Sequence, residues 1–80
     1  MTAPPTPARS LDARGLRCPL PLIKARNEIE FIEVGEVLEI LATDPGAAHD
    51  FKAWCRRQGH ELVGRAEEPG PVFRFLIRRA

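Results

Sequence analysis

Near its N-terminus the chain reads Leu11-Asp12-Ala13-Arg14-Gly15-Leu16-Arg17-Cys18-Pro19-Leu20-Pro21. The apolar positions Leu11 and Ala13 are typical of a short strand, which we predict over residues 10–13, and Gly15 suits the turn after it. Proline is favoured in the first turn of a helix, where its missing N–H costs no hydrogen bond. We therefore predict a helix from Pro19 onward, with Cys18 at or just before its N-terminus.

The position predicted for Cys18 favours a reactive thiol. Unpaired N–H groups at a helix N-terminus carry about half a positive charge, and Arg14, Arg17 and Lys24 are close in sequence. Such surroundings are expected to lower the pKa of the thiol, and the thiolate is the nucleophile. The alternative is a small buried hydrophobic residue, as most free cysteines are, although the nearby glycine, prolines and arginines indicate an exposed turn.

Hydrophobic periodicity predicts the remaining elements. Residues 19–32 fit a helix with one apolar stripe, formed by Leu22, Ile23, Ile29 and Ile32. The later elements follow as a strand over 36–43, a helix entered at Asp44-Pro45 and ended by Gly59, a strand over 60–67 with Leu62, Gly64 and Ala66 on one face, a turn over 68–71 and a strand over 72–78. This order, β-α-β-α-β-β, predicts an α+β fold: a two-layer α/β sandwich with both helices on one face of a four-stranded sheet. The open face would carry Val37, Leu41, Leu76 and several charges.

Length and composition limit the classes of protein to which the chain can belong. Eighty residues make one domain, which we place at residues 10–80 after a flexible, proline-containing tail at residues 1–9. The net charge of +1 argues against a DNA-coating protein. Two cysteines are too few for a disulfide scaffold, and no metal site is predicted. The sequence contains neither a secretory signal nor a membrane helix, so we expect a cytoplasmic protein.

The stretch Leu11–Pro21 resembles the signature of the TusA/SirA-like sulfur-carrier family, a CPxP motif after D-x-x-G-x-x. Further similarity lies in Asp44-Pro45-Gly46-Ala47, Phe51 to Cys55, His60-Glu61-Leu62-Val63 and Phe73 to Arg78, so that it covers roughly residues 10–79. The resemblance implies a two-layer α/β sandwich with a mixed sheet. It also implies that Cys18, which matches the motif cysteine, accepts sulfane sulfur as a persulfide and passes it to a partner.

The resemblance also implies the partners. Donors would be cysteine desulfurases or rhodanese-type proteins, and recipients would serve tRNA thiolation, molybdenum-cofactor supply or bacterial sulfur oxidation. The persulfide would be the only cofactor-like group. We expect no direct nucleic-acid or membrane contact and a monomer when the carrier is free. Because the sequence offers no base at a defined distance from Cys18, a sulfurtransferase role is expected only within a relay, without turnover in isolation.

Several residues near Cys18 are expected to support it. Asp12 would fix the turn by bonding loop amides, the alternative being direct proton transfer. Gly15 would permit the turn or a partner's close approach. Pro19 and Pro21 would either stiffen the site or simply start the helix. The basic residues, which would steer partners or be ordinary solvated charges, are Arg14, Arg17, Lys24 and Arg26.

Two other interpretations remain open. A small RNA-binding module could use Arg65, Arg74, Arg78 and Arg79 for phosphate contacts, although the chain has no tyrosine. A thiol-based redox regulator could use Cys18 as an oxidation sensor. Cys55 lies on the apolar stripe of the second predicted helix, where burial is expected, but the sequence leaves open a Cys18–Cys55 disulfide.

Overall fold

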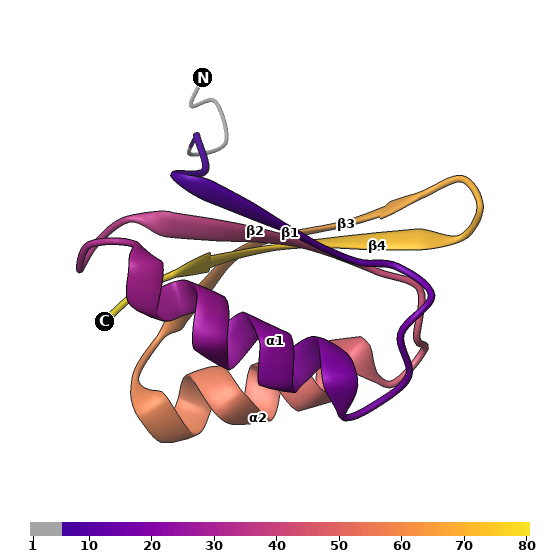
Figure 1. Cartoon of the computed structure of the whole chain (residues 1–80), viewed down its shortest axis with the longest axis horizontal. Coiled ribbons are helices and arrows are strands. Elements are labelled where there is room, and N and C mark those ends of the chain that lie inside the picture. Colours follow the sequence, from indigo (N-terminus) through magenta and orange to yellow (C-terminus); the bar gives the residue numbers. More distant parts are fainter. Residues whose placement is uncertain (1–5) are drawn as a thin grey trace.

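The computed structural model of the chain describes residues 6–80. Most of the expected N-terminal tail, residues 1–5, lies outside the described residues, and Arg9 belongs to the first strand instead of the tail. The elements follow the chain as β1 (Arg9–Ala13), α1 (Leu20–Glu28), a short 3-10 helix η1 (Ile29–Phe31), β2 (Val37–Ala42), α2 (Ala47–Gln58), β3 (Glu61–Glu68) and β4 (Val72–Arg78) (Figure 1).

The four strands form one mixed sheet in the order β1-β2-β4-β3. β1 pairs in parallel with β2, whereas β4 is antiparallel to both of its neighbours. Both helices cover the same face of this sheet (Figure 1). The predicted α+β sandwich is therefore confirmed, including the mixed sheet that the family resemblance implied.

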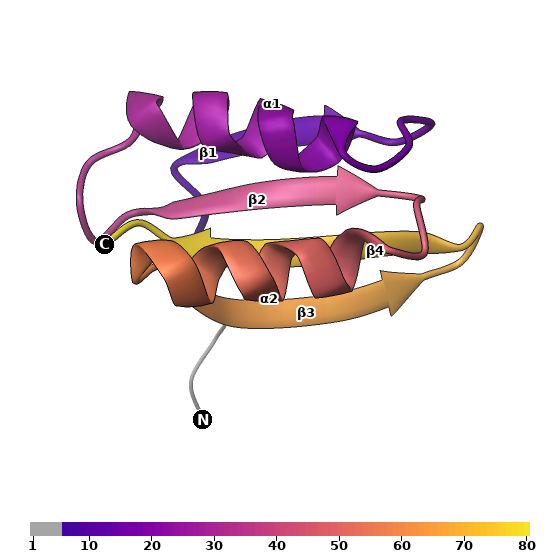
Figure 2. The ribbon, with the colours of Figure 1, turned by 90° about the horizontal axis from the view of Figure 1, so that it is seen from below.

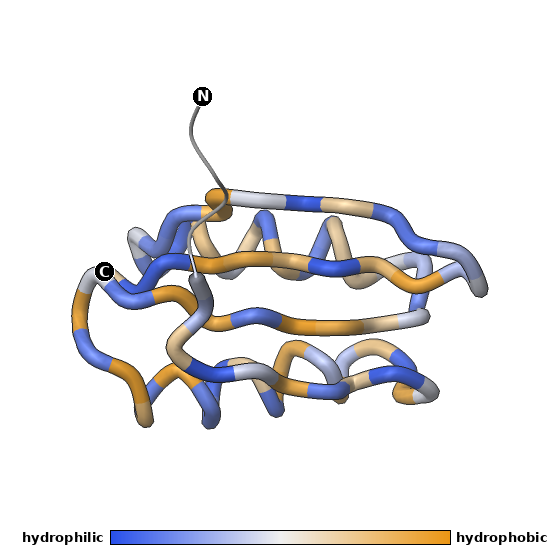
Figure 3. Tube along the Cα trace, turned by 90° about the horizontal axis from the view of Figure 1, so that it is seen from above, coloured by the Kyte–Doolittle hydropathy of each residue, from blue (hydrophilic) through white to orange (hydrophobic). Residues whose placement is uncertain are grey.

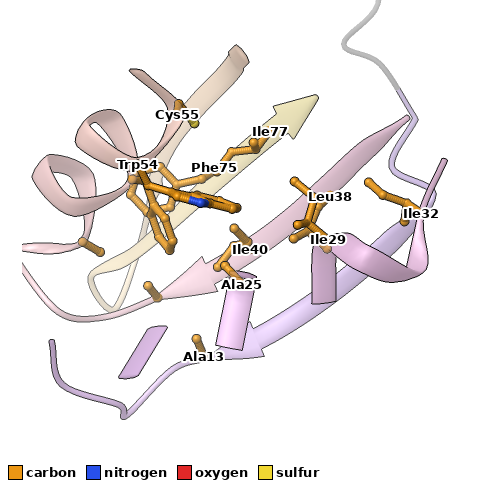
Figure 4. Close-up of a cluster of buried hydrophobic side chains, with 13 residues drawn as sticks. Ala13, Ala25, Ile29, Ile32, Leu38, Ile40, Trp54, Cys55, Phe75 and Ile77 are labelled. Carbon is orange, nitrogen blue, oxygen red and sulfur yellow. The ribbon is translucent and has the colours of Figure 1, made fainter. Parts of the chain in front are cut away.

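The core fills the space between the sheet and the two helices (Figure 4). The ring of Phe51 on α2 lies 4.9 Å from that of Phe75 on β4, centroid to centroid, and both side chains are fully buried. Burying a side chain of this size contributes about 1.5–3 kcal/mol. The two central strands are largely hydrophobic along their length, and the edge strands carry more hydrophilic residues (Figure 3). The strand predicted over 72–78 is confirmed, and its Phe75 and Ile77 face the helices.

Strand β3 departs from its predicted alternation. Leu62 pairs with Ile77, but Gly64 pairs with Leu76, so Val63 is an extra residue at a β-bulge. One extra residue reverses which side chains face the core. Leu62 therefore lies on the helix side while Gly64 and Ala66 lie on the open face, and the prediction that all three share a face was wrong.

The helices also differ in detail from their predictions. In α1 the buried residues are Pro21 and Ala25, whereas Ile23, expected in the apolar stripe, is 42% exposed. Helix α2 begins at Ala47 with Gly46 as its N-cap, later than predicted, so Asp44 lies two residues before the N-cap. There its Oδ2 accepts a hydrogen bond from the Gly46 N–H at 3.0 Å, an Asx turn that precedes the helix.

The open face of the sheet carries a network of charged side chains. Arg74 on β4 bonds Glu39 on β2 at 2.8 Å and Glu68 on β3 at 2.9 Å, and Glu39 also accepts a hydrogen bond from the Ser10 hydroxyl at 2.8 Å. Val37 and Leu76, predicted on this face, are nevertheless 3% and 9% exposed. The face is thus internally paired instead of forming a free basic surface.

Candidate functional site

The site lies where the loop after β1 and the loop after β2 meet. Because β1 and β2 are parallel, their carboxyl ends reach the same edge of the sheet, and both helices begin at that edge (Figure 2). The backbone N–H of Gly15 in the first loop donates to Thr43 Oγ1 in the second, at 2.9 Å. This hydrogen bond fixes the two helix starts relative to each other.

Asp12 and Gly15 build the turn that leads to Cys18. Asp12 Oδ1 accepts from the backbone N–H of Arg14 at 3.1 Å, and its carboxylate also forms a two-point ion pair with the Arg14 guanidinium at 2.8 Å. The Arg14 side chain lowers the pKa of Asp12 to about 2. Gly15 has φ of 81°, a conformation that side-chain-bearing residues rarely adopt. The turn-fixing role expected for Asp12 is what the geometry supports.

The two prolines frame the start of α1. Pro19 is the N-cap and Pro21 lies in the first turn, where its ring is buried. The Ile23 N–H donates to the Pro19 carbonyl at 3.1 Å, and the Leu20 N–H donates to the Arg17 carbonyl at 2.8 Å. The Cys18–Pro19 peptide bond is cis. Cys18 therefore precedes the helix by two residues, close to where the sequence placed it.

Cys18 is exposed, and its sulfur contacts a carboxylate from the other helix. The thiol donates to Asp50 Oδ2 across 2.7 Å, and Asp50 belongs to the first turn of α2. The hydrogen bond to Asp50 raises the pKa of the Cys18 thiol, and partial desolvation and the charges of Asp50 and Asp44 act in the same direction. The expected lowering of this pKa was therefore wrong.

The carboxylate outweighs the helix terminus for a simple reason of charge and distance. A helix N-terminus offers about half a positive charge, spread over several N–H groups. Asp50 places a full negative charge in direct contact with the sulfur, and Asp44 adds a second, more distant one. These carboxylates thus favour the protonated form of the Cys18 thiol.

The basic residues expected around Cys18 do not form one rim. The Arg14 guanidinium is engaged by Asp12. Arg26 lies in the last turn of α1 and lines a shallow hollow with Trp54, Gln58 and His60, at the far end of the helices. Arg17, next to Cys18, and Lys24 on α1 are exposed. Partner steering by these four residues stays a prediction, and Arg26 lies at the opposite end of α1 from Cys18.

Cys55 occupies a different environment. It is 5% exposed within the core on α2, and burial raises its pKa to about 11. Asp50 and Cys55 are five residues apart, so their side chains leave the helix in directions about 140° apart. Both cysteines are free thiols. The expected burial of Cys55 is confirmed, and the Cys18–Cys55 disulfide is not formed.

The arginines required by the RNA-binding interpretation are largely occupied. Besides Arg74, Arg78 pairs with Glu61 at 3.2 Å and Arg79 with Glu30 at 3.3 Å.

Within residues 6–80, no group of three or more histidine, cysteine, aspartate or glutamate side chains could hold a metal ion. In the same part of the chain no helix has the length and apolar character needed to cross a membrane.

Asp50 is the site residue that sequence reasoning missed. Its place in the first turn of α2 is an ordinary position for an acidic side chain, which favours a helix N-terminus anywhere. The available signal was topological: two helices that follow parallel strands begin at the same edge. Which side chain of α2 then faces Cys18 depends on the packing of the helices, which the sequence pattern does not give.

Comparisons with known proteins show which proteins the chain is similar to. The profile of the family described as Sulfurtransferase TusA matches residues 9–79. The chain is 43% identical over 72 residues to the sulfur carrier protein TusA of Allochromatium vinosum, covering 90% of this chain and 93% of that protein. It is 44% identical over 69 residues to the putative sulfur carrier protein YrkF of Bacillus subtilis, covering 86% of this chain but only 37% of that longer protein.

A solved structure supports the fold. The SirA-like protein of Desulfitobacterium hafniense superposes with a TM-score of 0.77 at 24% sequence identity, covering 88% of this chain and 95% of that one. The two chains therefore share the helix-covered, four-stranded architecture.

Proposed function

The chain belongs to the TusA sulfurtransferase family and is a sulfur carrier, and from this premise we propose that it carries sulfur as a persulfide on Cys18. The observation that supports the proposal most strongly is the exposed Cys18 sulfur at the edge where both helices begin, within the Cys-Pro-x-Pro sequence. Cys55 is buried and does not offer an accessible alternative.

The transfer resembles thiol–disulfide exchange. The Cys18 thiolate attacks the outer sulfur of a persulfide on the donor protein. A bond forms between Cys18 Sγ and that sulfur while the donor's S–S bond breaks, and the donor cysteine leaves as a thiolate. The proton lost by Cys18 ends on this leaving group, so no external oxidant or reductant is needed. Delivery to an acceptor repeats the exchange in the opposite sense.

A carrier of this kind works between a sulfur donor and a sulfur acceptor, and the surface beside Cys18 suits protein partners. Leu20 and Ile23, on the first turn of α1, are 46% and 42% exposed. Apolar side chains next to an exposed thiol provide contact area for a docking protein. We propose donors of the cysteine desulfurase or rhodanese type, and acceptors in tRNA thiolation, molybdenum-cofactor supply or sulfur oxidation.

The remaining parts of the proposal concern the protein's setting. Two free thiols, one of them exposed, suit the reducing cytoplasm. We propose a monomeric relay protein that needs no bound cofactor apart from the carried sulfur and that turns over only between its partners. Arg17 and Lys24 would speed the approach of acidic partner surfaces.

Intact-mass measurement tests the proposal. The protein is incubated with a cysteine desulfurase and cysteine, or with a rhodanese and thiosulfate, and its mass is recorded without reductant. We expect a gain of one sulfur atom in the wild type and in Cys55→Ser, and none in Cys18→Ser. Equal sulfur uptake by Cys18→Ser, or loss of uptake in a folded Cys55→Ser, would show that the carried sulfur is not on Cys18.

A further inference from the structure

Asp50 contacts the atom that would carry the sulfur. Its Oδ2 lies 2.7 Å from Cys18 Sγ, and it reaches this position from α2, on the opposite side of the site from the Cys18 loop. Asp44, the other nearby acid, is already used to accept the Gly46 N–H. A carboxylate that accepts a hydrogen bond from the thiol of an exposed cysteine is an unusual arrangement for a nucleophile, since activated cysteines normally lie beside cations.

We infer that Asp50 controls the state of Cys18: it holds the sulfur of the empty carrier protonated and turned toward α2, and it leaves the loaded sulfur free to point outward. This inference rests on the proposed function, because it concerns the cysteine that would be loaded. It assigns a role to a residue outside the Cys-Pro-x-Pro stretch.

The contact between Cys18 Sγ and Asp50 Oδ2 concerns the carrier before a sulfur is loaded. An ionised carboxylate only accepts hydrogen bonds, so the contact requires a proton on the sulfur. The carboxylates that act on Cys18 are Asp50 and Asp44, on the α2 side. Among the basic residues, Arg17 is its neighbour in the chain, Lys24 lies on α1, and Arg14 is bound to Asp12. The direction of the Cys18 pKa shift agrees with a thiol held in its neutral form. A neutral thiol reacts slowly with oxidants and alkylating agents.

Loading removes the basis of this contact. In Cys18–S–SH the inner sulfur has no proton to donate to Asp50. The outer sulfur is more acidic than a thiol, and once ionised it is repelled by the carboxylates of Asp50 and Asp44. The charged sulfur therefore turns away from α2 and toward solvent, where an acceptor protein can reach it. One carboxylate thus distinguishes the empty from the loaded carrier.

The test measures alkylation of Cys18 by iodoacetamide as a function of pH, on the full chain, with the modified residue located by mass spectrometry. In Asp50→Asn we expect the midpoint of the profile to move to lower pH. The rate at pH 7 should rise by about twofold or more, because the gain in thiolate is partly offset by a weaker nucleophile. Asp50→Glu keeps the charge and should stay nearer to wild type. Glu67→Gln removes an exposed acid on β3 and should leave the profile unchanged.

An Asp50→Asn profile that matches wild type, or that moves to higher pH, would overturn the inference. Far-UV circular dichroism checks that each variant is folded, and Asp50→Ser, also uncharged, serves as a second test if asparagine disturbs α2. The outcome is independent of sulfur loading. If Cys18→Ser still takes up sulfur while Asp50→Asn shifts the profile, the proposed function fails and the Asp50–Cys18 coupling stands. If loading is normal and the profile does not move, the coupling fails and the proposed function stands.

Discussion

Replacing Thr43 by valine should loosen the site without removing any residue that contacts Cys18. Valine has nearly the shape of threonine but lacks the hydroxyl that accepts the Gly15 N–H at 2.9 Å. That hydrogen bond joins the loop before α1 to the loop before α2. It thereby connects the turn that holds Cys18 to the end of β2, from which the chain leads to Asp50.

The size of the effect follows from the nature of this bond. A typical intramolecular hydrogen bond contributes about 0.5–1.5 kcal/mol to the free energy of unfolding. The Gly15–Thr43 bond lies near the surface, so water can replace the lost acceptor, and we expect the lower half of that range. For a domain of this size each kcal/mol lowers Tm by about 4–8 °C. Thr43→Val should therefore lose about 2–8 °C.

Two measurements check this prediction. Thermal unfolding followed by circular dichroism gives the change in Tm, and Thr43→Ser, which keeps the hydroxyl, should recover most of the loss. Iodoacetamide alkylation at pH 7 should be faster in Thr43→Val than in Thr43→Ser, because separated loops weaken the thiol contact with Asp50. If valine and serine variants have the same Tm and the same alkylation rate, the Gly15–Thr43 bond does not organise the site.

Three further outcomes are expected elsewhere in the molecule. Phe51→Ala should reduce the free energy of unfolding, measured in urea, by about 3–5 kcal/mol. That is a large share of the roughly 4–12 kcal/mol typical of a protein of 80 residues. A loss below about 1 kcal/mol would contradict the packing described for the Phe51 ring. Gly64→Ala would place a methyl group 2.9 Å from Leu76 Cδ1, so it should cost about 1–3 kcal/mol. In a double-mutant cycle it should cost less in a Leu76→Ala background than in the wild type; an equal cost in both backgrounds would locate the strain elsewhere. Burial lowers the pKa of His60 below its ordinary 6.5, so the unfolded chain binds the proton more readily and stability should fall as the pH drops from 7.5 to 5.5. In thermal unfolding, His60→Gln should reduce this dependence of Tm on pH. An unchanged dependence would show that His60 is not its cause.

The sequence was sufficient for the fold because its strongest signals are local. Strand β4 alternates large apolar and charged residues, and Gly59 ends α2 with φ of 77°. The errors arose where tertiary contacts decide. The bulge at Val63 becomes necessary only when β3 pairs with β4 around Leu76. Ile23 is exposed because α1 turns Pro21 and Ala25 toward the sheet, a choice of face that small residues permit and that hydrophobicity alone did not reveal.

The site shows the same division between local and tertiary information. The position of Cys18 before α1, the turn made by Asp12 and the burial of Cys55 all follow from residues close in sequence, and each was predicted. The state of the thiol did not follow, because the deciding group lies 32 residues away on another helix. The sequence indicated the helix N-terminus, which acts to lower the pKa of the Cys18 thiol, but it did not indicate the carboxylate of Asp50, which is nearer and raises that pKa.

This contact explains how a carrier can have an exposed sulfur and still be selective. If Cys18 carries the sulfur, donor and acceptor must both reach it, and an exposed thiolate would react with any oxidant or electrophile. Under the proposed role of Asp50, its hydrogen bond with the thiol slows such reactions in the free carrier. A donor that placed a cation against Asp50 would offset the charge that disfavours the thiolate. Reactivity at Cys18 would then depend on the docked partner, which is the property that a sulfur relay requires.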